Sequence, residues 1–151
     1  MQPNLSQPYP IEATLPSAGI VVRFAAMVYD TLIMLGIYFV LTLIVTGVNG
    51  MESVKGPLFQ SLLFIAAFSF FAKFWTDGGQ TAGMKAWKIR VETLDGRPIT
   101  LQQALIRFLF AFVSALPLGL GYLWMFVDSN QLTLHERISN TRTTVIPKPQ
   151  K

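Results

Sequence analysis

The sequence carries an acidic residue, Asp30, inside a long apolar run. The run from Phe24 to Met51 has no other charged residue, and a carboxylate within a membrane segment is costly enough to be a functional hypothesis by default. A helix would place Arg23 on the same face as Asp30, about 10 Å away. Two roles for Asp30 stay open. It carries a proton or a cation in transport, or it forms a structural ion pair with Arg107 or Arg23.

Further charged residues flank the apolar runs and are candidates for pairing. Arg107 lies inside an expected helix, where a partner carboxylate is needed to offset the cost of burial. Asp128 closes the last apolar run, and Glu136 follows it. We expect Arg23 to meet Asp128 or Glu136, because all three belong to the cytoplasmic boundary of the membrane segments.

His135 is the only histidine, and the chain has no cysteine. One histidine beside Glu136 makes a poor metal site, so the sequence predicts no bound metal. We expect His135, Glu136 and Arg137 to form a hydrogen-bonded surface motif on the cytoplasmic side.

The sequence shows none of the motifs that would indicate an enzyme. The segment with Gly79, Gln80, Thr81 and Gly83 is not a nucleotide-binding loop. Its amide and hydroxyl groups are expected to satisfy backbone groups where helices end. No catalytic triad order or carboxylate dyad is present, so we expect neither a catalytic residue nor a cofactor.

The composition indicates a protein of the lipid bilayer. Of the 151 residues, 52% are hydrophobic and only 13% are charged, against about 25% charged in an average soluble domain. The mean hydropathy is +0.46. The net charge of +4 is typical of cytoplasmic loops in a membrane protein. The basic residues form no stripe, so nucleic acid is not an expected partner.

Hydropathy predicts an all-α integral membrane fold. The first transmembrane helix covers 19–46 and the second covers 57–73, since a bilayer core needs about 20 apolar residues in helix. The third apolar block is read as two short helices, 101–116 and 118–129, which form a hairpin broken at Pro117. A single span is the alternative for this block.

A polar segment separates the second and third apolar blocks. Alternation over Ile89–Thr93 and the turn signal Asp95–Gly96 predict a small cytoplasmic strand-turn element near 88–99. Thr100 followed by Gln103 predicts a capping box at the start of the next helix.

The chain is expected to consist of one membrane domain with short tails. Residues 1–18 contain four prolines and no basic residue, which predicts a disordered tail and no signal peptide. The domain covers 19–146, and 147–151 form a flexible tail.

Charge and internal similarity favour the hairpin over a single span. With a hairpin, both termini are cytoplasmic and every basic residue except Lys55 lies on or near that side. A weak repeat relates the segment from Asp77 to Val91 to the segment from Asp128 to Val145. Each half would then be a helical hairpin followed by a polar segment.

These residues together resemble the RDD family of small membrane proteins. The resemblance rests on Arg23, Asp30, the segments 79–83 and 89–91, and a T-L-H-x-R-like segment at 133–141, and it covers about 18–146. The chain departs from the family pattern by having Glu136 in place of Asp, Asn140 in place of Gly, and Leu132 in place of Gln. The family's second aspartate corresponds to Asp128 or to Glu136.

The resemblance implies a multi-pass protein of the bacterial inner membrane that transports a small ion or solute. With so few spans, such a transporter would need to be a homo-oligomer or to bind another membrane protein. The alternative is a non-catalytic accessory or regulatory subunit of a membrane complex.

Overall fold

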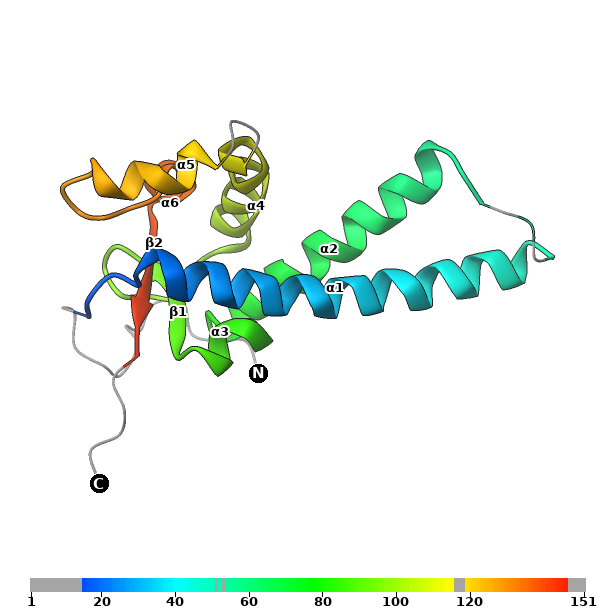
Figure 1. Cartoon of the computed structure of the whole chain (residues 1–151), viewed down its shortest axis with the longest axis horizontal. Coiled ribbons are helices and arrows are strands. Elements are labelled where there is room, and N and C mark those ends of the chain that lie inside the picture. The colour runs from blue at the N-terminus through cyan, green and yellow to red at the C-terminus, as the bar shows by residue number, and fades with distance from the viewer. Residues whose placement is uncertain (1–14, 51, 53, 116–118, 147–151) are drawn as a thin grey trace, which may run out of the picture.

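Two long helices extend away from the rest of the molecule (Figure 1). The computed structural model describes residues 15–50, 52, 54–115 and 119–146. Helices α1 (Ile20–Val48) and α2 (Pro57–Asp77) are each long and apolar enough to cross a membrane. Only 6% of the most apolar window of α1 and 17% of that of α2 are buried inside the chain, whereas a core helix would be mostly covered. Both predicted long helices are confirmed, with ends shifted by a few residues.

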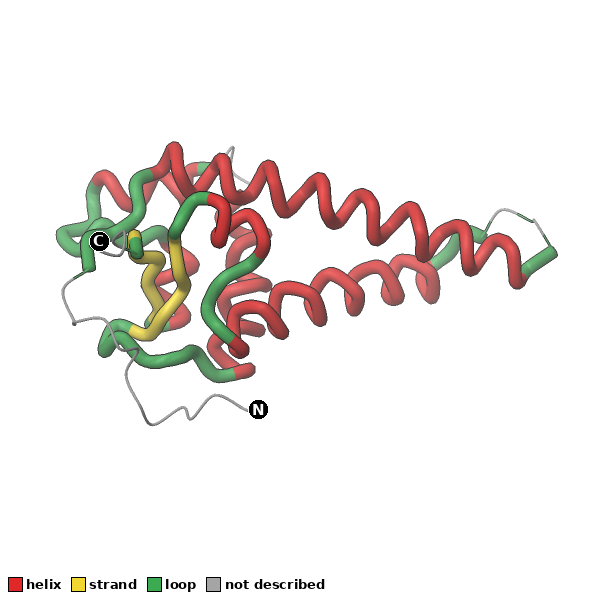
Figure 2. Tube along the Cα trace, turned by 90° about the horizontal axis from the view of Figure 1, so that it is seen from below, coloured by secondary structure: helices red, strands yellow, loops and turns green. Residues whose placement is uncertain are grey.

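The remaining elements are short and gather around the N-terminal end of α1 (Figures 1 and 2). In chain order they are α3 (Ala82–Ala86), β1 (Ile89–Thr93), α4 (Leu101–Ala115), α5 (Leu120–Leu123), the 3-10 turn η1 (Trp124–Phe126), α6 (Leu134–Ser139) and β2 (Thr141–Val145). Figure 2 shows the strands at this end, opposite the C-terminal end of α1. The elements that can hold polar chemistry are therefore concentrated in one half of the molecule.

The predicted strand is present, but its partner comes from the other end of the chain. β1 pairs antiparallel with β2, with Ile89 opposite Val145 and Thr93 opposite Thr141. The strand-turn element predicted near 88–99 is thus one half of a two-stranded sheet. Alternation of apolar and polar residues along 89–93 predicts the strand. Its pairing with β2, about 50 residues later in the sequence, depends on the tertiary fold.

The residues just before α1 belong to the folded domain. The N–H of Ala18 donates to the carbonyl of Thr143 at 2.9 Å, and the N–H of Val145 donates to the carbonyl of Pro16 at 3.0 Å. These bonds extend the sheet on the free edge of β2. The expectation of a disordered tail over 1–18 is therefore wrong for 16–18; residues 1–14 and 147–151 lie outside the described part.

Helix α4 begins with the predicted capping box. The N–H of Thr100 donates to Gln103 Oε1 at 3.0 Å, and the N–H of Gln103 donates to Thr100 Oγ1 at 3.2 Å. Two N–H groups that the helix cannot satisfy internally are thereby paired. Local sequence alone fixes where this helix starts.

The third apolar block is interrupted, and its second arm is shorter than predicted. Gly119 has a φ of +78°, and Gly121 lies so close to α4 that a Cβ there would come within 2.5 Å of Ser114 Cβ. The arm expected over 118–129 forms only α5 and η1, where the N–H groups of residues 127 and 128 both bond to the carbonyl of Trp124. The bond from residue 127 spans three residues, as in a 3-10 turn, and such tightening is common where a helix ends. Residues 116–118, with the predicted break at Pro117, lie outside the described part.

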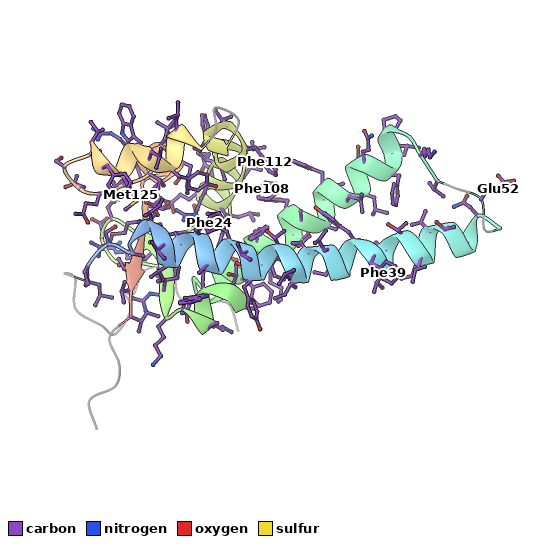
Figure 3. The ribbon with its side chains drawn as sticks, viewed as in Figure 1. Phe24, Phe39, Glu52, Phe108, Phe112 and Met125 are labelled. Carbon is purple, nitrogen blue, oxygen red and sulfur yellow. The ribbon has the colours of Figure 1, made fainter. Side chains whose placement is uncertain are left out.

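Aromatic rings join α2 to α4. The ring of Phe108 lies 5.4 Å from that of Phe64, 5.5 Å from that of Phe68 and 6.0 Å from that of Phe71. Edge-on and tilted aromatic pairs add about 0.5–1.5 kcal/mol each beyond their area burial. Figure 3 shows Phe108 and Phe112 extending from α4. This contact anchors α4, and with it Arg107, against the second long helix.

The two halves of the chain share one order of elements. α1, α2, α3 and β1 form the first half, and α4, α5 with η1, α6 and β2 form the second. In each half a short helix begins after a threonine, Thr81 or Thr133, and leads into a strand. The weak sequence repeat therefore corresponds to a repeat of elements, although the apolar helices of the second half are much shorter.

The close approach of α3 to α1 yields a test of the fold. At Gly83, a Cβ would overlap the carbonyl oxygen of Ala26 and come within 3.0 Å of Asp30 Oδ1. Gly83→Ala should therefore lower the free energy of unfolding by about 1–3 kcal/mol, as overpacking does. Gly36→Ala in α1 is the matched control, because a Cβ there meets nothing within 4 Å. Thermal melts in detergent measure both, and equal melting temperatures would contradict the close approach.

Candidate functional site

The centre of the polar region is the buried carboxylate of Glu136. It lies in the first turn of α6, where the N–H of Thr133 donates to Glu136 Oε2 at 3.0 Å and the Thr133 side chain caps the helix in return. The Thr-x-x-Glu spacing is itself a capping-box signal. That signal is present in the sequence and predicts the orientation of Glu136. We had considered Glu136 as a charged partner, as part of a surface motif and as a departure from the family pattern, but not as a helix cap.

The other oxygen of Glu136, Oε1, forms ion pairs with two arginines. Arg23 Nη1 lies 2.5 Å from Oε1 and Arg107 Nη2 lies 3.5 Å from the same atom. Thr143 Oγ1 also donates to Oε1, at 2.5 Å. The carboxylate is fully buried and both arginines are almost so. Arg23 thus meets Glu136, one of the two carboxylates expected for it. Arg107 also has an acidic partner, but this partner is Glu136 and not Asp30.

Both guanidinium groups are also held by the sheet. Arg107 Nη1 donates to Thr141 Oγ1 at 2.9 Å and Nη2 donates to Thr143 Oγ1 at 2.8 Å. Arg23 Nε donates to the carbonyl of Ala18 at 2.7 Å. These bonds fix both side chains, so the three charges form a rigid centre that joins α1, α4, α6 and β2.

The charges around Glu136 set its protonation state and that of His135. Burial alone would raise the pKa of Glu136, but Arg23 and Arg107 outweigh it and lower the pKa to about 2. Burial lowers the pKa of His135 to about 3; Arg107 adds to this effect, against an opposing attraction to Glu136. Near neutral pH, the carboxylate is therefore ionised and the imidazole is neutral.

His135 is buried, which corrects the expectation of a surface motif. Its side chain is 4% exposed and packs edge-on against Tyr122, with 5.1 Å between ring centroids. The hydroxyl of Thr133 lies within hydrogen-bond distance of the ring. The polar residues at 135–137 suggest that this segment is exposed to solvent. However, α6 packs against α4 and α5, and this packing turns His135 inward. Of this motif, Arg137 does lie outward, with a side chain 59% exposed.

Asp30 does not pair with either arginine, and that expectation is wrong. Thr81 Oγ1 donates to Asp30 Oδ2 at 2.5 Å and the N–H of Gly83 donates to Oδ1 at 2.9 Å. Among the described residues no cation forms an ion pair with it. The physical reason is the glycine at 83, which lets the start of α3 come close enough to α1 to occupy both oxygens.

Asp128 closes a turn. Its Oδ2 accepts the N–H groups of Asn130 at 3.0 Å and Leu132 at 3.1 Å, and Arg137 contacts its other oxygen. The N–H of Leu132 lowers the pKa of Asp128, burial opposes this, and Asn130 and Arg137 add to the lowering. Asp128 therefore orders the loop that leads into α6 and does not meet Arg23.

The segment around Gln80 connects α2 to the sheet. Gln80 Nε2 donates to the carbonyl of Ile89 at 2.8 Å, and the N–H of Val91 donates to the carbonyl of Gly79 at 2.7 Å. Gly79 has a φ of +70°, a conformation that favours glycine. These bonds join β1 to the segment that follows α2. The role expected at helix ends belongs to Thr81, whose side chain accepts from the N–H of Met84 at the start of α3.

A cavity of about 300 Å³ lies between α1 and α4. Its polar lining includes Arg23, Asp30, Arg107 and His135, and most of the remaining wall is apolar. Within the described ranges, no group of three His, Asp or Glu side chains could hold a metal ion. The cavity thus combines one carboxylate, two guanidinium groups and a neutral imidazole with an apolar wall.

Comparison with known proteins gives one match, which covers most of the chain. The sequence model of the RDD family matches residues 17–140. The chain belongs to the RDD family. In this RDD protein the carboxylate that meets Arg23 is Glu136, and Asp30 faces α3. No curated protein and no solved structure matches the chain.

The Glu136 centre yields a stability test. Glu136→Gln leaves two buried guanidinium groups without a counter-charge, which typically costs about 3–5 kcal/mol. Denaturant titration in detergent should show this loss. Asp77→Asn is the control, since the exposed pair that Asp77 forms with Lys73 at 3.3 Å contributes about 0.5 kcal/mol or less. A Glu136→Gln protein as stable as the control would show that the centre does not stabilise the RDD fold.

The neutral state of His135 yields a pH test. An unfolded histidine titrates near 6.5, while the folded pKa is about 3, so the unfolded chain binds an extra proton between these values. The free energy of unfolding should therefore fall as pH drops below 6.5, by up to about 1.4 kcal/mol per unit from this group. His135→Gln should flatten the dependence between pH 6.5 and 4.5. The further loss below 4.5, where Glu136 contributes, should remain; identical profiles would exclude His135 as the cause.

Proposed function

We propose that this RDD protein transports a small ion or solute across the membrane, with Asp30 as the coupling carboxylate. The observation that carries the proposal is the position of Asp30. It is 3% exposed on a helix long enough to span a membrane, it lines the cavity, and no cation pairs with it among the described residues. An ionised carboxylate in such surroundings is unfavourable. Uptake of a proton or a small cation would neutralise it, which is the chemistry of coupled transport.

The hydrogen bonds to Asp30 suit a site that changes its charge. Thr81 and Gly83 donate to the two oxygens from one direction, while the cavity adjoins the same side chain. Met84 N–H also donates to Thr81 Oγ1 at 3.2 Å, which fixes the hydroxyl as a donor toward Asp30. The carboxylate is therefore positioned by neutral groups, and its charge is left for a mobile ion to balance.

The membrane arrangement belongs to the same proposal. α1 and α2 cross the bacterial inner membrane, the broken block enters it from the cytoplasmic side as a hairpin, and both termini are cytoplasmic. The positive-inside rule supports this orientation, because the basic residues concentrate on one side. Reporter fusions after Gln80 and at Lys151 should both report the cytoplasm. A periplasmic signal at Lys151 would contradict the hairpin.

The assembly is proposed to be a homo-oligomer or a complex with another membrane protein. α1 and α2 leave most of their apolar residues uncovered, and one pair of long helices encloses no path by itself. The alternative function is that of a non-catalytic accessory subunit, which would use the same uncovered helices to bind its partner.

Flux through liposomes that contain only this chain tests the proposal. Under an imposed potassium diffusion potential, an internal pH dye should report proton movement for the parent protein. Asp30→Asn should reduce the rate at least tenfold yet stay folded. The amide can still accept from Gly83 and can donate to Thr81, but it cannot take up a proton at neutral pH.

Asp77→Asn is the matched control, because it removes an exposed carboxylate at the end of α2. It should leave flux unchanged. A parent chain without flux of protons or small cations would favour the accessory subunit. An Asp30→Asn protein with parental flux would remove Asp30 from the mechanism.

A further inference from the structure

Helix α4 has an apolar face that no other part of the described chain covers. Leu101, Leu105, Leu109 and Val113 follow one another at intervals of four residues and are between 40% and 61% exposed. The one charged residue of the helix, Arg107, points the other way and is buried in the domain. The polarity of α4 is therefore reversed with respect to a helix on the surface of a soluble protein, whose apolar side faces the core.

The direction of α4 differs from that of the two long helices. Figure 1 views α4 almost along its axis, whereas α1 and α2 extend across the same view. With its 15 residues, α4 is about 22 Å long, which is too short to cross a hydrocarbon core of about 30 Å. If α1 and α2 cross the bilayer, α4 therefore runs along the plane of the membrane.

The exposed face of α4 adjoins the uncovered part of α2. Phe112 lies seven residues after Leu105, on the same side of the helix, and is 52% exposed. Its ring contacts that of Phe64, with 6.3 Å between the centroids. Phe64 belongs to the half of α2 that extends away from the short elements. The apolar face of α4 is thus continuous with the surface of a helix that is long enough to span a membrane.

The apolar surface continues beyond the break in this block. Leu120, Leu123 and Trp124 are each about half exposed, and α5 packs so closely on α4 that a Cβ at Gly121 would lie 2.5 Å from Ser114 Cβ. From residue 108 to residue 127 the sequence has no charged residue. Tryptophan is enriched at the level of the lipid head groups, so an exposed indole in this surface fits the boundary of a bilayer.

We propose that α4 lies flat in the cytoplasmic interface of the membrane, with its apolar face in contact with the acyl chains of the lipids. Helices of this kind bury their apolar face about 5–10 Å deep. The side of α4 with Arg107 is covered by the domain, so no charged side chain enters the hydrocarbon. The inference rests on the proposal that α1 and α2 cross the membrane, and it limits the depth to which the broken block enters.

Nitroxide labels measure the depth of this face directly. The chain has no cysteine, so Leu105→Cys, Leu109→Cys and Val113→Cys each carry a single label in phosphatidylcholine nanodiscs. Oxygen concentrates in the bilayer and a nickel chelate stays in water, so power saturation with each reports the depth of the label. Oxygen should reach all three labels better than nickel does, and their depths should be nearly equal because the helix lies flat.

Three positions with the same spacing on α1 are the matched control. Phe24→Cys, Val28→Cys and Leu32→Cys replace exposed residues and cover eight positions, which is about 12 Å along a helix axis. Their depths should increase from residue 24 to residue 32 by most of this distance, because α1 crosses the bilayer. The depths on α4 should differ by less than half as much.

Each other outcome overturns the proposal in a recognisable way. A gradient along α4 as large as that along α1 would show that α4 enters the bilayer end-on, and it would leave the spanning helices in place. Labels on α4 that nickel reaches best would place the face in water, and labels that neither reagent reaches would place it against another protein. Equal depths along α1 would contradict the membrane arrangement itself. None of these measurements depends on ion flux, so a chain without transport can still have α4 in the interface.

Discussion

One buried carboxylate with two buried arginines is the interaction on which the rest of the domain depends. Glu136 forms ion pairs with Arg23 at the start of α1 and with Arg107 on α4, and it accepts a hydrogen bond from the hydroxyl of Thr143 on β2. Removal of the Glu136 carboxylate would leave two buried guanidinium groups without a counter-charge in the interior. The guanidinium group of Arg107 faces the π system of Trp75, an arrangement that is favourable for a cation out of water. The site therefore fixes how the two halves of the chain meet.

A second carboxylate serves the first half in a related way. Asp30 accepts from Thr81, which caps α3, and Glu136 forms a reciprocal cap with Thr133 at the start of α6. In both halves an acidic side chain thus secures the short helix that leads into a strand. The two carboxylates come from different elements: Asp30 belongs to the long helix α1 and contacts α3, whereas Glu136 belongs to the short helix α6 that it caps. Only Glu136 meets arginine, so the two carboxylates have different electrostatic surroundings and are suited to different work.

Sequence patterns predicted the elements whose cause is local. The apolar runs gave α1 and α2, alternation gave β1, and the spacing of Thr100 and Gln103 gave the start of α4. The family match at 17–140 confirmed the resemblance seen in the motifs. The predictions that failed concern side chains whose surroundings are formed by residues distant in the sequence. The partner of Asp30 lies 51 positions along the chain, and it can approach only because residue 83 is a glycine. The burial of His135 follows from the packing of α6, which no local pattern of polarity records.

The span of chain that closes the arginine–glutamate centre has a consequence for biosynthesis. Arg23 and Thr143 are separated by 120 positions, so at about 5–20 residues per second roughly 6–24 s pass between their synthesis. Throughout that interval α1 can insert while its first-turn arginine has no counter-charge. The arginine must be solvated by water or other polar groups until Glu136 has been synthesised and can pair with it. A chain that ends before Glu136 cannot form this centre, so its Arg23 lacks the buried carboxylate that pairs with it in the complete domain.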